Sequence, residues 1–351
     1  MKLILEPRPQ PSKIMVYLSP LIAMLLTLLV GVLVFSALGK SPLAAFHAFF
    51  IAPIDDWYGF GELLIKASPL ALIALGLSVG FRANVWNIGA EGQLIMGAIA
   101  AGGVALNFHE TEGWWILPLM YLAGALGGMA WAAIPALLRT RFNANEILVS
   151  LMLVYVANLA LSWLIHGPWR DPNGYGFPQS LVFGDSAMLP LLLAGTRTHA
   201  GVLLSLIALV AAYIFFRWGL VAFQMRVAGL APRAAAYAGF SQKRMVWIGL
   251  LTGGAAAGLA GTSEIAGPIG QLLIPISPGY GFSAIIVAFV GRLHPLGILL
   301  ASLLMALLYL GGEAAQMQLS LPSSVSSVFQ GLLLFFLLAT DALINFRLRW
   351  S

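Results

Sequence analysis

The chain has 351 residues, of which 60% are hydrophobic and only 9% are charged, and its mean hydropathy is +0.92. A soluble domain carries about 25% charged residues, so the composition excludes a soluble globular protein and predicts an all-α, polytopic integral membrane protein. The absence of cysteine excludes disulfides, thiolate nucleophiles and cysteine metal sites. The net charge of +5 comes from basic residues at the ends of apolar segments, so we expect no nucleic-acid partner.

About ten apolar segments approach the roughly 20 residues that a helix needs to cross a bilayer. The predicted spans are Ile14–Leu38, Glu62–Phe81, Ile88–Leu106, Trp114–Leu138, Ile147–His166, Ala200–Phe216, Met245–Ile265, Phe282–Val290, Pro295–Leu310 and Val325–Leu343. They predict a single transmembrane domain over residues 1–351, so any soluble activity is expected from other chains. The first span is too long for a cleaved signal peptide and is expected to remain as an anchor. The eighth is too short to cross alone, which predicts a broken or tilted helix, or one that extends back toward Ile276.

The Lys and Arg residues predict the orientation, because they concentrate in cytoplasmic loops. With the N-terminus inside, only Lys40, Lys66, Arg170 and Arg197 fall outside, which leaves 18 − 4 = 14 basic residues inside. Both termini are therefore predicted to be cytoplasmic, with residues 1–13 forming a short N-terminal segment.

Two connectors are long enough to have roles of their own. The external loop 167–199 carries Pro, Gly and Asn, which oppose helix formation, and its aromatic residues Trp169, Tyr175 and Phe177 suit an interfacial lid or docking surface. The cytoplasmic connector 217–244 contains AGLAPRAAAYAGF. Pro232 can begin a helix there and Gly239 can end it, so we expect a short helix parallel to the membrane.

Two short motif matches and the histidines are not predicted to have a catalytic or ligand-binding role. GLSVG, residues 76–80, matches a serine-hydrolase string but lies late in a span, where Ser78 suits a helix contact. GKS, residues 39–41, resembles the end of a phosphate-binding loop but lacks its first glycine and a preceding strand. The five histidines are scattered singly, without metal-ligand spacing.

A polar cluster interrupts the apolar sequence at FRANVWNIGAEGQLIMG, residues 81–97. An ionisable group inside a membrane costs at least about 2.5 to 3.5 kcal/mol, so Glu91 needs a partner, water or a functional reason. One interpretation is a simple cytoplasmic turn with Asn84 and Asn87 as caps. The other is a turn that re-enters the bundle, in which Glu91 and Gln93 anchor a broken helix by bonding its free backbone groups. Both make the stretch a structural pivot rather than a catalytic centre.

Polar residues also gather at three later places. FNANEILVSLML, residues 142–153, predicts a helix N-terminus with Asn145 near the cap and Glu146 in the first turn. GTSEIAGPIGQ and PISPGYGFSAIIVAF contain Glu264 and Tyr280. These two stretches are interpreted either as plain loops or as a flexible entrance from the outer side.

Three stretches carry a resemblance to a known family: FRANVWNIGAEGQLIMGA, FNANEILVSLMLVYVANL and RVAGLAPRAAAYAGFSQKR. They resemble the permease subunits of bacterial ABC importers in the branched-chain amino acid and simple-sugar permease superfamily, most closely the nucleoside-type permeases that work with basic membrane lipoproteins. The similarity covers roughly residues 62–341.

This resemblance implies a multi-pass chain in the bacterial cytoplasmic (inner) membrane, surrounded by lipid. Its implied partners are a second, related permease subunit, ABC ATPase subunits and an extracytoplasmic substrate-binding protein. The chain itself would bind no cofactor, because ATP and Mg would be used by the ATPase subunits.

In such permeases a short cytoplasmic helix docks into a groove of the ATPase, and the resemblance places this coupling helix over residues 229–239. The implied coupling residues are Arg226, Gly229, Pro232, Arg233, Tyr237 and Gly239. The candidate residues of the substrate pathway or pivot are Asn84, Trp86, Asn87, Glu91, Gln93, Asn145, Glu146, Glu264 and Tyr280.

The expected function is therefore the permease subunit of an ATP-driven importer for a small polar solute, with nucleosides as the expected class. The alternative is a self-sufficient secondary transporter or channel, and against it the acidic residues lie near span ends rather than in an intramembrane chain. A membrane-embedded enzyme is the third possibility. No catalytic constellation or ATPase motif supports it, so we expect a chain that is not an enzyme.

Overall fold

A computed structural model describes residues 3–8, 10, 12–322 and 324–350. These residues are mostly helical, with one short pair of strands, which confirms the all-α class. Every predicted span coincides with a helix, and eight of these helices are long and apolar enough to cross a membrane. The other two are α4 (Ala90–Asn107), whose first turn is polar, and the short α11 (Tyr280–Val290). The count of ten spans and the side of each terminus stay predictions.

The chain divides into two compact units, one formed by Met1–Leu63 with Leu304–Ser351 and the other by Leu64–Leu303. Two helices contribute to both units, α3 (Trp57–Arg82) and α12 (Pro295–Leu319). We call the units the terminal unit and the central unit. The single domain predicted from the sequence stays a prediction.

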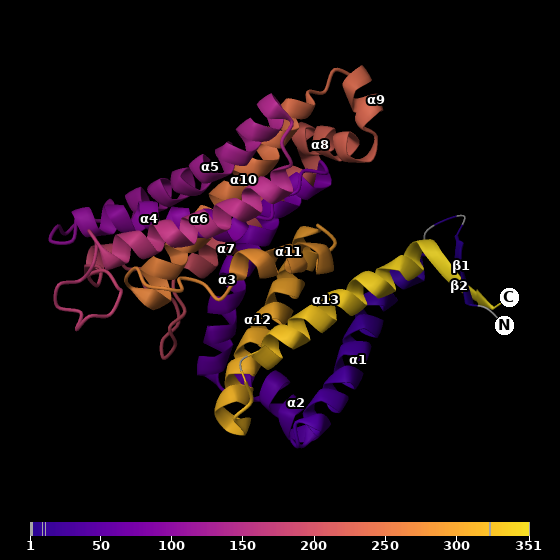
Figure 1. The fold of residues 1–351 in the computed structure, drawn as a ribbon, viewed down its shortest axis with the longest axis horizontal. Coiled ribbons are helices and arrows are strands. Elements are labelled where there is room, and N and C mark those ends of the chain that lie inside the picture. Colours follow the sequence, from indigo (N-terminus) through magenta and orange to yellow (C-terminus); the bar gives the residue numbers. More distant parts are fainter. Residues whose placement is uncertain (1–2, 9, 11, 323, 351) are drawn as a thin grey trace. The chain divides into compact units, whose positions relative to one another are not determined.

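The central unit is built around three mutually packed helices, α4, α5 (Ile116–Phe142) and α10 (Gln242–Glu264). The helix α6 (Glu146–His166) packs against α4 and α5 (Figure 1). The remaining helices of this unit are α7 (Gly201–Trp218), α8 (Leu220–Leu230), α9 (Pro232–Tyr237) and α11. The loop 167–199, which is predicted to be external, contains a short 3-10 turn, Asp185–Ala187, and forms isolated β-bridges from Gln179 to Leu273 and from Leu191 to His199.

Small residues bring α5 and α10 into close contact. A Cβ atom placed on Gly124 or Gly128 of α5 would collide with α10, at Thr262 and at the Gly254 carbonyl respectively. Gly97 of α4 approaches Gly258 of α10 in the same way. Such close approach is how membrane helices gain packing energy where no hydrophobic effect drives them together.

The helix α10 does not end cleanly but continues as a π-helical turn, Ile265–Ile269, which contains Pro268. A π turn and a proline are recognised causes of helix irregularity. After it the chain runs without regular structure to Gly279, so α11 begins at Tyr280 and does not extend back toward Ile276. The expectation of broken helices therefore holds for this stretch.

The terminal unit contains α1 (Lys13–Ala37), α2 (Pro42–Phe50), the 3-10 turn Ala52–Ile54 and α13 (Ser324–Asn345). Its core includes an aromatic group in which the ring of Phe329 lies 5.2 Å from that of Phe35 and 5.1 Å from that of Phe49. The strands β1 (Leu3–Pro7) and β2 (Phe346–Trp350) pair antiparallel, so the two ends of the chain lie side by side. Termini on the same side of a membrane fit this pairing.

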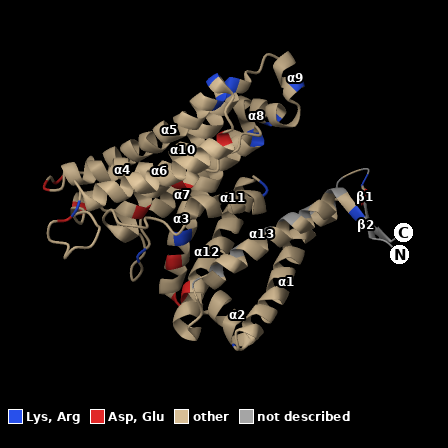
Figure 2. Ribbon diagram, in the orientation of Figure 1, with Lys and Arg blue, Asp and Glu red and all other residues tan. Residues whose placement is uncertain are grey.

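Charge separates along the central unit. Lys and Arg gather at the end that carries α8 and α9, while acidic residues mark the loops at the other end (Figure 2). This is the distribution that the predicted orientation requires, with α8 and α9 on the cytoplasmic side.

Candidate functional site

The turn between α3 and α4 is held by its own side chains. Asn84 adopts a left-handed backbone conformation (φ 57°), which asparagine tolerates better than most residues. Its side-chain oxygen accepts a hydrogen bond from the Trp86 indole at 2.9 Å. The indole stacks on Phe289 of α11, with ring centroids 5.4 Å apart. The turn therefore orients Trp86 toward packing with α11.

Asn87 and Gln93 form a reciprocal amide pair inside the protein. The Asn87 amide nitrogen donates to Gln93 at 2.8 Å, and the Gln93 nitrogen donates back to Asn87 at 3.1 Å. The Asn87 oxygen also accepts from the Gly89 N–H at 3.0 Å. Gln93 thus bonds a side chain, and not the free backbone groups of a broken helix as one interpretation expected.

Glu91 does bond the backbone of a short helix. Its carboxylate accepts from the Gly281 N–H at 2.6 Å and from the Ser277 hydroxyl at 2.5 Å. That hydroxyl in turn accepts from the N–H groups of Gly279 and Tyr280, at 3.0 and 3.1 Å. The first N–H groups of a helix have no intrahelical partner, so Glu91 and Ser277 together complete the start of α11.

Close packing reinforces this contact between α4 and α11, which we call the Glu91 clasp and define by Glu91, Ser277 and Gly281. A Cβ atom on Gly281 would collide with the backbone of Glu91. Only glycine fits here, because the two backbones touch. The clasp is buried, since Glu91 and Ser277 are 6% and 7% exposed.

Glu264 and Tyr280 are buried in the same unit. Lys66 and Glu91 are the charged groups that act on the Glu264 carboxyl. Next to Glu264, the Ser263 hydroxyl lies 2.9 Å from the Tyr121 hydroxyl. The central unit therefore contains two buried carboxyls, several buried hydroxyls and the half-buried Lys66, which is an unusual density of polar groups for a membrane protein.

The start of α6 confirms the expected cap and adds an ion pair. The Asn145 side chain accepts from the Ile147 N–H at 2.9 Å, as an N-cap does. Glu146 forms an ion pair with Arg139 of α5 and also accepts from the Trp86 N–H at 3.4 Å. The cap of α6 is thereby tied to the α3–α4 turn.

The α8–α9 segment contains the short helix expected from the sequence, and its cytoplasmic location stays a prediction. The helix α9 begins at Pro232 and ends at Tyr237, and Gly239 follows in a left-handed conformation (φ 79°). Arg233 is exposed and Tyr237 is 97% exposed, whereas Ala235 is fully buried. One face of α9 therefore packs against the rest of the protein, and the opposite face is exposed.

The anchor of α9 is an apolar cluster shared with the α3–α4 turn. Ala235 packs in one hydrophobic cluster with Ala228 of α8 and with Ala83 and Val85 of the turn. A Cβ atom on Gly229 would collide with the Arg82 carbonyl oxygen. The exposed helix thus shares a hydrophobic cluster with the turn that leads into Glu91, and α8 approaches that turn closely at Gly229.

Arg82 links the end of α3 to two further elements. Its guanidinium lies 3.7 Å from the ring centroid of Phe216 in α7 and donates to the Leu293 carbonyl at 2.6 Å. Leu293 follows α11, so one arginine connects the end of α3 to the far end of the clasped helix. Cation–π contact and a charge-assisted hydrogen bond both strengthen such a link.

The structure brings most of the predicted pathway residues together and adds some that the sequence did not reveal. The residues from Asn84 to Gln93 lie next to the start of α6. The partners that were missed are Arg139, Ser150, Ser277, Gly281 and Lys66. No spacing pattern could have found the two clasp partners, because they lie 186 and 190 residues from Glu91.

The false leads have structural explanations. Ser78 is fully buried and its hydroxyl donates to the Leu75 carbonyl of the same helix at 2.7 Å, so this hydroxyl is satisfied within α3. Among the described residues no group of His, Cys, Asp and Glu is arranged to hold a metal ion.

The structure is a helical bundle with membrane-length apolar helices, buried polar groups in its interior and a short exposed helix, α9, which is an arrangement suited to a membrane transporter. The family described as branched-chain amino acid transport system / permease component matches residues 59–338, and the chain belongs to this family. It is a permease subunit and not an enzyme.

Three relatives are similar over nearly the whole chain. A glucose ABC transporter permease protein of Haloferax volcanii is 36% identical, covering 98% of this chain and 92% of its own length. A guanosine ABC transporter permease protein of Bacillus subtilis is 29% identical, covering 93% and 94%. A nucleoside ABC transporter permease protein of Lactococcus lactis is 28% identical, covering 91% and 90%. No solved structure gives a significant match.

Proposed function

We propose that this chain translocates its solute by alternating access, powered by ATPase subunits that dock on α9. The observation that carries the proposal is the hydrophobic cluster that contains Ala235 of α9 together with Ala83 and Val85 of the α3–α4 turn. Any force on α9 is transmitted through this cluster to the α3–α4 turn.

The path inward from the turn follows from the contacts. The turn leads into α4, and the Glu91 clasp joins α4 to α11. Arg82 joins the end of α3 to the opposite end of α11. A movement of α8 and α9 would therefore move α11 against α4, and this is the proposed pivot of the transport cycle.

The coupling residues have distinct roles in this proposal. Arg233 and Tyr237 contact the ATPase, since they are exposed, and Arg226 adds charge to the same surface. Pro232 begins the helix, and Gly239 turns the chain after the helix has ended at Tyr237. Gly229 lets α8 approach the end of α3.

For the solute, we propose nucleosides, with glucose-type sugars as the second candidate. Two of the three relatives carry guanosine or nucleoside in their names, and the relative with the highest identity of the three carries glucose. A sugar ring is common to both classes. Its hydroxyls would exchange hydrogen bonds with the polar groups near Glu91, Glu264 and Tyr280, which form the proposed pathway.

The proposed assembly contains a second, related permease and an extracytoplasmic binding protein in the bacterial cytoplasmic membrane. Bacillus subtilis has two guanosine ABC transporter permease proteins that are similar to this chain, which supports a heteromeric pair. The binding protein would dock on the external loop, where Tyr175 is 99% exposed. ATP and Mg would bind to the ATPases.

The test is solute uptake by vesicles that contain the chain with its co-purified partners. ATP inside and binding protein outside should together drive uptake of radiolabelled guanosine, and unlabelled glucose in excess should reveal whether the sugar competes. Uptake that continues without ATP would instead indicate a secondary transporter.

A further inference from the structure

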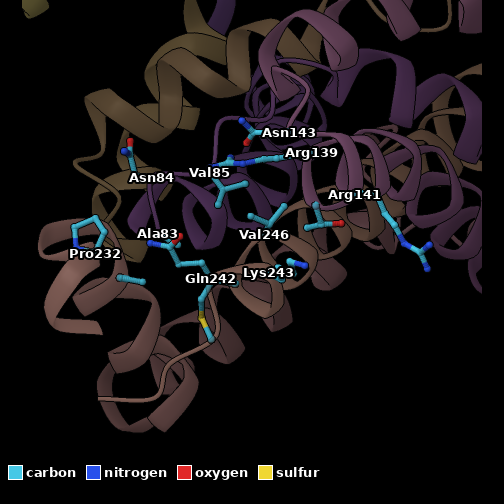
Figure 3. A pocket seen from close by; sticks show the side chains of 13 residues that line it. Ala83, Asn84, Val85, Arg139, Arg141, Asn143, Pro232, Gln242, Lys243 and Val246 are labelled. Atoms are coloured by element: carbon cyan, nitrogen blue, oxygen red, sulfur yellow. The ribbon is translucent and has the colours of Figure 1, made fainter. Parts of the chain in front are cut away.

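A polar cavity of about 360 Å³ lies between five segments of the central unit. It is bounded by the α3–α4 turn, the end of α5, Ala228 of α8, the beginning of α9 and the beginning of α10. Figure 3 shows the side chains around it, with Pro232 and Asn84 toward one side and Arg141 toward the other. No role of the proposed transport cycle requires this cavity.

The cavity carries excess positive charge. Arg139, Arg141 and Lys243 line it, and among them only Arg139 forms an ion pair, with Glu146, within the described part of the chain. Arg141 and Lys243 are exposed. Arginine has five N–H donors and Glu146 does not use them all, so all three cations can still donate to an added anion.

Neutral donors complete the polar part of the lining. Asn84, Asn143, Gln242 and Thr140 contribute amide and hydroxyl groups. A phosphate group presents several oxygens that accept charge-assisted hydrogen bonds from such a set. Three cationic side chains and three amides offer more hydrogen-bond donors than the two oxygens of one carboxylate would accept.

The location of the cavity fits a membrane surface. Phe142, which precedes the lining residue Asn143, is 73% exposed, and Trp218 at the end of α7 is 71% exposed. Exposed aromatic residues at helix ends mark the headgroup level of a bilayer. Basic pockets between membrane helices at this level are suited to anionic lipid headgroups.

We propose that this cavity binds a phosphate group, supplied by an anionic phospholipid of the adjacent leaflet. The phosphate lies between Arg139, Arg141 and Lys243, and the acyl chains extend along the apolar surface of the bundle. Because Pro232 also lines the cavity, the bound headgroup joins the start of α9 to the end of α5.

The test uses the purified full-length chain in phosphatidylcholine nanodiscs with and without phosphatidylglycerol. Native mass spectrometry counts the retained lipids, and the thermal unfolding midpoint reports stabilisation. Wild-type protein should retain phosphatidylglycerol in preference to phosphatidylcholine and unfold at a higher temperature with it. The double variant Arg141→Gln, Lys243→Gln should bind phosphatidylglycerol about 10-fold or more weakly, since each cation near the surface contributes to lipid attraction.

Two control variants make the result specific. Arg217→Gln with Arg244→Gln removes two exposed cations from the same end of the unit that do not line the cavity, and it should bind phosphatidylglycerol like wild type. Arg141→Lys with Lys243→Arg keeps both charges and should retain most of the binding. An unchanged midpoint in phosphatidylcholine alone shows that the double variant is folded.

The remaining arms distinguish the source of the phosphate. Inorganic phosphate added in detergent, without anionic lipid, would stabilise the wild type but not the double variant if free phosphate is the natural ligand; the phosphate site would stand and the lipid source would be overturned. Equal loss of binding in the Arg217, Arg244 control would show that the lipid is attracted by general surface charge, and it would overturn the proposal of a specific site. Normal lipid binding by the double variant, with loss of the co-purifying ATPase, would overturn the proposal and make the cavity a receptor for a carboxylate of the ATPase.

Discussion

The Glu91 clasp and the exposed face of α9 place their polar groups in opposite environments. In the clasp both carboxylate oxygens of Glu91 accept hydrogen bonds from groups of the same chain, and the site is buried. On α9 the side chains of Arg233 and Tyr237 extend away from the chain. A polar group within a membrane must be satisfied internally, whereas one outside it is free to meet another protein. We therefore propose a positioning role for the clasp and a docking role for α9, and the predictions below test these roles.

The largest expected effect comes from removing the docking face. Arg233→Glu combined with Tyr237→Ala should reduce ATP-dependent uptake at least about tenfold, because a charge reversal at a contact costs more than 1.4 kcal/mol. The unfolding midpoint should not change, since both side chains are exposed. The matched control is Arg244→Glu with Trp218→Ala, which makes the same kind of change away from α9. Undiminished uptake by the α9 variant would remove the docking assignment.

Glu91→Leu should destabilise the clasp by about 2 to 5 kcal/mol, because it leaves the Ser277 hydroxyl and the Gly281 N–H buried without their acceptor. Glu91→Gln should cost less, since its amide oxygen still accepts one of these bonds. Chemical unfolding of the purified variants measures the difference. The acidic residue Glu110 is exposed, so Glu110→Leu serves as the control and should be nearly neutral. Equal loss in Gln and Leu would indicate that the charge itself is required.

Ala235→Leu should weaken the connection between α9 and the α3–α4 turn. The buried methyl group has no room for a larger side chain, and overpacking costs about 1 to 3 kcal/mol. Uptake should fall several-fold, although the docking face is intact. The exposed Ala211 of α7 gives the control, Ala211→Leu. If the two variants transport equally well, force does not pass through this cluster.

The smallest effect is expected at the external loop. Tyr175→Ala with Phe177→Ala removes two exposed aromatic side chains, 99% and 67% exposed, and should lower the affinity for the binding protein about two- to fivefold while leaving stability unchanged. Trp169→Ala in the same loop should instead lower the unfolding midpoint, because its ring packs against Gly103 of α4. Titration of binding protein into the uptake assay separates the two results.

Short-range features of the fold were predictable because each depends on neighbouring residues. The apolar segments determined the helices, Asn145 determined the cap of α6, and Pro232 with Gly239 determined where α9 begins and where the chain turns after it. The expectation for Gln93 failed, because its nearest acceptor and donor is the Asn87 side chain six residues away. The pattern of apolar residues does not indicate whether a polar side chain such as Gln93 will bond to the backbone or to another side chain.

The sequence by itself determined that this is a helical membrane protein and which residues form its helices. It also identified the polar residues whose placement inside a membrane costs free energy. The physical reason is that hydropathy and capping act over one or two helical turns. Only the tertiary structure decided what those polar residues do. It placed Ser277 and Gly281 against Glu91, put Ala235 in one hydrophobic cluster with Ala83 and Val85, and assembled one cavity from five separate segments. Such contacts depend on how backbone segments that are distant in the sequence pack together. Small residues such as Gly281 permit that packing, but the sequence does not indicate which residues they will contact.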